Sequence, residues 1–307
     1  MSIYRSNKNT MIFLDSRDIL CIHYPWYTIN AVKWCLPVRS SCDILAVYKT
    51  FCNPEITPMR YFKILACKIF QRELAQVLLT CPNALDITFM RQDLHMTPTL
   101  LRDALQKEID LIESGNDLHT NENRFGEMEA ILLGYGLCSN ALAGIKSSRL
   151  PLVIPRAHDC ITHFMGSKEA YADYFEKVKG TFFYNQSWLD LGLELGESDL
   201  ERKRSEYMEE FDGDEDTVEY LLEMDKEMLK NYHYITYITW PGMANESGIE
   251  KANAMAAKAG MKLLLYEGSN RLMEDFVNGN WNEKDFLILK PGQILQPSYD
   301  SMIIKGV

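Results

Sequence analysis

Short apolar runs alternate with longer amphipathic segments along most of this 307-residue chain. From residue 59 onward, the short runs predict buried strands, and apolar positions three or four residues apart predict helices. The predicted strands are 61–67, 85–90, 129–135, 150–155, 181–184, 234–240, 261–266 and 286–290. The predicted helices run from the first strand to residue 79 and over 97–114, 161–179, 197–231 (a pair), 245–259 and 270–278.

This alternation favours an α/β fold, because strands separated by helices of such length usually pair in parallel through right-handed crossovers. We therefore expect mostly parallel sheets with helices on both faces. The similar order of elements early and late in the chain leaves open a duplication into two Rossmann-like halves. The expected divisions are an atypical N-terminal extension (1–58), a first α/β half (59–185), a charged helical insertion (186–233) and a second α/β half (234–307).

The extension 1–58 differs from the rest of the chain in composition. It has poor periodicity, six Lys and Arg against four Asp and Glu, and four of the eight cysteines. Pro54 and Pro58 separate it from the first clean strand. We expect Met59 to be the native start, with the preceding residues an upstream extension. An intact mass measured on protein from the native host tests this, and a chain beginning at Met1 or Ser2 would refute it.

Composition and charge exclude several classes of function. The net charge of −11 argues against non-specific nucleic-acid binding, which needs a basic surface. No apolar run approaches the roughly 18 residues of a membrane span. Asp15, Arg17 and Asp18 interrupt any signal peptide, so we expect a cytoplasmic protein without nucleic-acid or membrane partners. Eight cysteines in such a chain do not indicate a disulfide framework.

Three of these cysteines close apolar, strand-like runs, and each precedes a segment expected to be helical. They are Cys67, Cys138 and Cys160. The carboxyl ends of parallel strands lie on one edge of a sheet, where ligands bind, so three distant thiols can meet in one pocket. Three soft ligands at one point predict a metal ion or iron–sulfur cluster with an open position. No Cys-x-x-Cys pair is present, which excludes the usual zinc ribbon.

The residues around two of these cysteines add candidate chemistry. Before Cys138, Gly134 and Gly136 let the backbone turn sharply and approach a ligand. A tight turn around a buried thiol explains this segment equally well.

The run from Arg156 to Cys160 is the densest polar cluster to follow a strand. Asp159 is placed to cap the next helix, whose first turn would favour the Cys160 thiolate. Arg156 supplies positive charge for an anionic ligand or cluster. His158 is a candidate metal ligand or acid–base group. We therefore predict Gly134, Gly136, Arg156 and Asp159 as cofactor-binding residues.

Other residues at predicted strand ends are weaker candidates. His95 follows the second strand and is an alternative base, although a histidine there usually caps a helix. Several aromatic residues, among them Tyr135 and Trp188, could wall a pocket. The turns at 240–242 and 267–269 would supply its opposite wall.

Three segments resemble the family known as domain of unknown function 1638, from Met59 to about Gly292. They are Lys63–Lys68, Leu132–Cys138 and Pro155–Cys160. The resemblance implies an origin in anaerobic bacteria or archaea and a corrinoid-dependent methyl-transfer protein as a partner, but no assigned activity. Asp159 and His163 are too far apart for a corrinoid-binding signature, so we expect no corrinoid on this chain in the usual base-off manner.

Three hypotheses follow for a protein acting on a small-molecule substrate. The first is a metalloprotein in which Cys67, Cys138 and Cys160 hold zinc or an iron–sulfur cluster. The second is a metal-free thiol enzyme with Cys160 as nucleophile and His158 as base. The third is an accessory protein that binds an anion through Arg156 and helix N-termini. The absence of Cys-x-x-Cys spacing is compatible with zinc and with an iron–sulfur cluster. The anaerobic context of the family favours the iron–sulfur cluster.

Overall fold

The computed structural model describes four strands within residues 3–37 and most of residues 59–307. In the latter range it omits residues 93, 95, 96, 121–125, 194 and 196 and the side chains of 197–199. His95 and most of the extension lie outside the described residues. The chain forms two compact units, Met1–Met59 and Arg60–Val307. The first contains an antiparallel sheet of strands β1 (Ile3–Asn7), β2 (Thr10–Leu14), β3 (Ile19–His23) and β4 (Trp34–Pro37).

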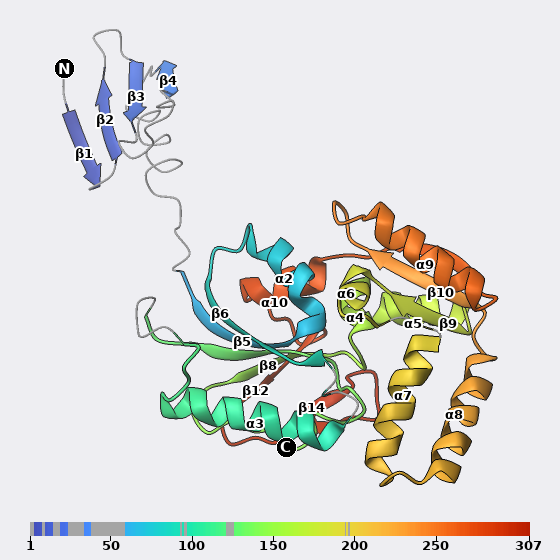
Figure 1. Cartoon of the computed structure of the whole chain (residues 1–307). Coiled ribbons are helices and arrows are strands. Elements are labelled where there is room, and N and C mark those ends of the chain that lie inside the picture. The colour runs from blue at the N-terminus through green and yellow to red at the C-terminus, as the bar shows by residue number, and fades with distance from the viewer. Residues whose placement is uncertain are drawn as a thin grey trace. The chain divides into compact units, whose positions relative to one another are not determined.

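The second unit is built around a five-stranded sheet in the order β12-β8-β7-β5-β6 (Figure 1). Its strands are β5 (Tyr61–Cys67), β6 (Ala84–Met90), β7 (Ala130–Gly134), β8 (Leu152–Pro155) and β12 (Phe286–Leu289). The first four are parallel, and β12 is antiparallel to β8. Every residue of β5, β7 and β8 is buried, as expected for continuous apolar strands covered on both faces.

Helices cover both faces of this sheet. On one face lies α3 (Pro98–Ser114); on the other lie α2 (Gln71–Leu78) and α10 (Arg271–Asn278) (Figure 1). A short 3-10 helix η1 (Lys68–Phe70) connects β5 to α2. The helix α3 buries Leu101, Leu105, Ile109 and Ile112, and this spacing of three or four residues explains its amphipathic pattern.

The second sheet of this unit has three parallel strands in the order β11-β10-β9. Its strands are β9 (Thr181–Tyr184), β10 (Tyr234–Thr239) and β11 (Lys262–Glu267). The helix α9 (Glu246–Lys258) packs on β10 and β11. Between β9 and β10 come the short α6 (Gln186–Asp190) and the charged pair α7 (Glu197–Glu210) and α8 (Glu215–Leu229). The predicted break between the charged helices is confirmed, because Asp212 and Gly213 have positive φ.

One predicted helix differs from the structure, and one hairpin was missed. The helix predicted over 161–179 is two helices, α4 (Ile161–Met165) and α5 (Lys168–Lys177). Gly166 (φ 88°) ends α4, and the Ser167 hydroxyl then caps α5 by accepting from the Ala170 N–H. A C-terminal hairpin of β13 (Leu295–Pro297) and β14 (Ile304–Gly306) was not predicted, because such short strands containing Pro and Gly lack a periodic signal.

The α/β fold class with mostly parallel sheets is confirmed. Strands from before and after the charged helices share each sheet: β9 pairs with β10, and β8 pairs with β12. The order β6-β5-β7-β8 reverses between β5 and β7, which makes a topological switch point where open α/β sheets bind ligands. No helix in the described part of the chain has the length and apolar character needed to cross a bilayer.

Candidate functional site

A cavity of about 290 Å³ lies at this switch point, and Cys67, Cys138 and Cys160 all line it. Cys67 is the last residue of β5, Cys138 follows β7 and Cys160 follows β8. We call it the thiol cavity. Its other lining residues are Ile69, Phe70, Gln92, Tyr135, Gly136, Ser139, His158, Asp159 and Trp188. Three strand ends separated by up to 93 residues of sequence therefore contribute to one site.

The Cys138 loop has an unusual backbone. Cys138, Ser139 and Asn140 are consecutive non-glycine residues with φ of 45°, 52° and 66°. Such left-handed conformations are costly and persist where surrounding contacts enforce them, often at functional sites. Here the Cys138 N–H donates to the His158 carbonyl (3.0 Å), which ties the loop to the one after β8. The segment after Cys138 consists of turns, so the helix predicted there is absent.

The two predicted glycines have different neighbours. A Cβ on Gly136 would lie 2.7 Å from the backbone of Asp159, so glycine permits the close approach of the loops after β7 and β8. A Cβ on Gly134 would lie 2.9 Å from the Cβ of Ala66, so this glycine allows β5 and β7 to pack closely. Gly136 lines the thiol cavity and Gly134 does not.

Asp159 shapes the start of α4. Its carboxylate accepts from the Ile161 N–H (3.0 Å) and from the Tyr171 hydroxyl (3.0 Å). Burial raises the pKa of this carboxyl despite both hydrogen bonds. Cys160, beside it, occupies the N-cap position of α4, and the exposed His158 lies at the cavity surface.

Arg156 is not brought to the cavity. Its guanidinium donates to the carbonyls of Glu283 (2.8 Å), Met302 (2.9 Å) and Ile304. This buried arginine therefore anchors the C-terminal hairpin to the end of β8. The lining residues include neither lysine nor arginine, which removes support for an anion site based on Arg156.

The surroundings of two of the thiols, Cys138 and Cys160, favour the protonated form. Burial, followed by the neighbouring Cys67, raises the pKa of Cys138 to about 12. Burial also raises the pKa of Cys160 well above its ordinary value, with further contributions from Asp159, Cys138 and Cys67. The expectation that the dipole of the following helix favours the Cys160 thiolate is thus wrong, because α4 has only five residues and desolvation outweighs it.

The donor set differs from that of a single-ion site. Within the described ranges, no group of three or more His, Cys, Asp or Glu side chains is arranged to hold one metal ion. The three thiols nevertheless influence one another electrostatically and face the same cavity.

The second parallel sheet contributes one wall of the thiol cavity through Trp188 on α6. The Asn185 side chain caps α6 by accepting from the Trp188 N–H (3.0 Å). Asn185 and Ser187 also donate to the buried carboxyl of Glu73 on α2, each at 3.1 Å. Burial raises the pKa of Glu73 to about 7. Glu73 therefore connects α2, on the five-stranded sheet, to α6, which follows β9 of the three-stranded sheet.

The turns predicted as an opposite wall contact α4 instead. The indole N–H of Trp240 donates to the Phe164 carbonyl at 2.7 Å, and Ser269 N–H donates to the same oxygen at 3.3 Å. Ile69, Phe70 and Gln92 line the cavity but were not predicted. Gln92 follows the carboxyl end of β6, next to β5, and its position after a strand could have identified it as a cavity residue.

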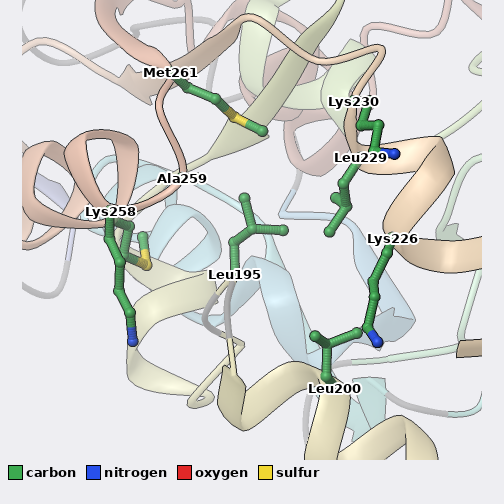
Figure 2. Close-up of a pocket in the computed structure, with 9 residues that line it drawn as sticks. Leu195, Leu200, Lys226, Leu229, Lys230, Lys258, Ala259 and Met261 are labelled. Atoms are coloured by element: carbon green, nitrogen blue, oxygen red, sulfur yellow. The ribbon is translucent and has the colours of Figure 1, made fainter. Parts of the chain in front are cut away.

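A second cavity, of about 340 Å³, lies near the ends of α8 and α9 (Figure 2). The apolar side chains of Leu195, Leu229 and Met261 point toward its centre, with lysines at its rim (Figure 2). Two of these lysines pair with glutamates one turn away, Lys226 with Glu223 and Lys230 with Glu227. Its lining holds lysines and the thioethers of Met255 and Met261 but no thiol and none of the site residues predicted from the sequence, so the thiol cavity is the candidate site.

Fold and site together define an open α/β protein with three cysteines at a topological switch point. The chain belongs to the family described as protein of unknown function (DUF1638), whose model matches residues 89–277. That match includes Cys138 and Cys160, whereas Cys67 precedes it. The search of curated proteins and the search of solved structures found no match.

Proposed function

We propose that this chain is an iron–sulfur protein in which Cys67, Cys138 and Cys160 hold one cluster and leave one iron open. The observation that carries the proposal is that three strand-end thiols line one cavity at the switch point. When bound, such a cluster supplies electron transfer or Lewis-acid chemistry at the iron without a cysteine.

The donor chemistry favours a cluster over a single zinc ion. Zinc needs its sulfurs at about 2.3 Å from one point, and the described residues form no such group. A cubane presents a different iron to each thiolate, so its cysteines lie further apart around a larger volume. A cationic metal core also offsets the cost of ionising one buried and two half-buried thiols in a cavity whose lining has no lysine or arginine.

The protein residues around the cluster have separable roles. Ile69, Phe70 and Trp188 provide apolar walls that exclude water from the sulfurs. His158 is exposed at the cavity, where its imidazole can contact a small substrate. This arrangement favours a neutral or weakly polar substrate, since the described lining contains no fixed cation.

The cellular setting is also part of the proposal. We infer a cytoplasmic protein of an anaerobe that works with a corrinoid-dependent methyl-transfer protein. Cys81, Cys138 and Cys160 are free thiols, in keeping with a reducing compartment. Whether the cluster makes the protein an enzyme depends on a substrate reaching the open iron.

The test is elemental analysis of the full chain, purified without oxygen. We expect iron and acid-labile sulfide in equal amounts, close to four of each per chain for a cubane, with a brown colour and a paramagnetic signal on reduction. One tightly bound zinc in colourless protein would replace the cluster by a zinc site. Protein free of both metals, with activity dependent on Cys160 alone, would favour the thiol enzyme.

A further inference from the structure

Tyr135 has a buried hydroxyl group with no hydrogen-bond partner. The residue follows β7, is only 2% exposed and lines the thiol cavity. Its hydroxyl oxygen has no partner among the described residues. Burying a hydroxyl without a partner is unfavourable, and a phenylalanine would fill the same space without that cost.

Several other described tyrosines have a side-chain partner for the hydroxyl group. The hydroxyls of five of them bond to another side chain: Tyr61 to Asp86, Tyr171 to Asp159, Tyr174 to Thr236, Tyr207 to Asp225 and Tyr237 to Gln186. An unpartnered hydroxyl in a functional cavity therefore indicates an acceptor that arrives with a ligand.

The backbone on both sides of Tyr135 is closely packed. Gly134 packs on Ala66 and Gly136 packs on Asp159, each too closely for a Cβ. The Tyr135 N–H donates to the Leu133 carbonyl at 2.9 Å, forming a tight turn between these glycines. These contacts constrain the backbone that carries Tyr135, which is one of the residues lining the cavity.

Two of the three thiols act electrostatically on this hydroxyl. After burial, Cys67 and Cys138 are the groups that raise the pKa of Tyr135 well above its ordinary value. The phenol thus stays protonated and can donate a hydrogen bond. The thiolates that line the same cavity are candidate acceptors once a metal centre has ionised them.

We propose that Tyr135 is a positioning residue that donates a hydrogen bond to sulfur of the three-cysteine centre and thereby raises its reduction potential. The inference rests on the proposed cluster. A donor at sulfur stabilises the reduced state, because that state carries one more negative charge after accepting an electron from an external reductant.

The experiment is a dithionite redox titration of the anaerobic full chain, followed by the paramagnetic signal of the reduced cluster. Tyr135→Phe should keep its iron and sulfide, and its midpoint potential should be more negative than that of the unmodified chain. The matched control is Tyr174→Phe, which removes a hydroxyl that bonds Thr236 at 2.8 Å, and its potential should be unchanged. Replacing Tyr135 by 3-fluorotyrosine, a stronger donor, should move the potential in the positive direction.

The outcomes separate this inference from the proposed function. An unmodified chain without iron and sulfide would overturn both. A loaded Tyr135→Phe variant with an unchanged potential would overturn only the role of Tyr135. Loss of the cluster from this variant would show a structural role and would also overturn the inference.

Discussion

The two parallel sheets of the second unit differ in what lies at the carboxyl ends of their strands. In the five-stranded sheet, the order reverses between β5 and β7, and a cavity with three thiols lies there. In the three-stranded sheet, β9, β10 and β11 follow chain order, and Trp240 and Ser269 bond the carbonyl of Phe164 on α4. Parallel pairing alone therefore does not make a site; the reversal of strand order opens the crevice.

The largest effect is expected from the cysteines. Replacing Cys67, Cys138 or Cys160 singly by serine should lower bound iron by more than about tenfold, because even changes outside the ligand set often cost that much. Iron and sulfide per folded chain measure the loss. Cys81→Ser is the matched control, since Cys81 bonds the Val277 carbonyl and does not line the cavity. Equal iron in all four variants would contradict a metal centre at the switch point of the five-stranded sheet.

A pH experiment tests the contact of Glu73 on α2 with Asn185 and Ser187. The Glu73 carboxyl, with its pKa raised from 4.5 to about 7, binds a proton more tightly in the folded chain than in the unfolded chain. Its contribution to stability is therefore complete below pH 4.5 and is lost as pH rises to 7, amounting to about 3 kcal/mol. Denaturant unfolding from pH 4 to 8 should show this decline, and Glu73→Gln should remove it.

The control for this experiment is Glu219→Gln on α8, an exposed position paired with Arg204. It should preserve the pH dependence of the unmodified chain. Parallel stability curves for Glu73→Gln and the unmodified chain would show that Glu73 is not the titrating group.

Gly136→Ala tests the close approach of the two loops at the cavity. The added Cβ would meet the Asp159 backbone at 2.7 Å, which should destabilise the fold by about 2 kcal/mol and lower iron per folded chain. Gly268→Ala, whose Cβ would meet the Phe164 carbonyl, should lose stability but keep its iron. Thermal unfolding and iron analysis measure both. A Gly136→Ala variant with full iron content would show that the close contact of these two loops is not needed to hold the cluster.

Trp240→Phe should have the smallest effect. It removes one hydrogen bond to the Phe164 carbonyl, worth about 1 kcal/mol, at the edge that we consider structural. Denaturant unfolding should detect the loss, while iron and midpoint potential stay the same. A changed potential would mean that this edge also belongs to the site.

Much of the fold could be predicted because buried strands and amphipathic helices have distinct periods. The end of β5 at Cys67 and the end of β8 before Cys160 followed from apolar runs, and parallel pairing explained why the two thiols could meet. The reversal of strand order could not be predicted, since pairing of β5 with both β6 and β7 is a tertiary choice.

The failures have physical causes. Arg156 follows a strand, but its partners are carbonyls of Glu283 and the C-terminal hairpin, far away in sequence. The left-handed turn at Cys138 involves residues that rarely adopt it, and contacts with His158 stabilise it. The pKa of Cys160 depends on burial, which local sequence does not reveal.

The most direct test of the central claim is anomalous diffraction at the iron edge from crystals of the full chain grown without oxygen. The account predicts one cluster of iron atoms in the thiol cavity, bonded to the sulfurs of Cys67, Cys138 and Cys160. Iron bound elsewhere, or a cavity in which any of these three sulfurs is unbonded to the metal centre, would contradict it.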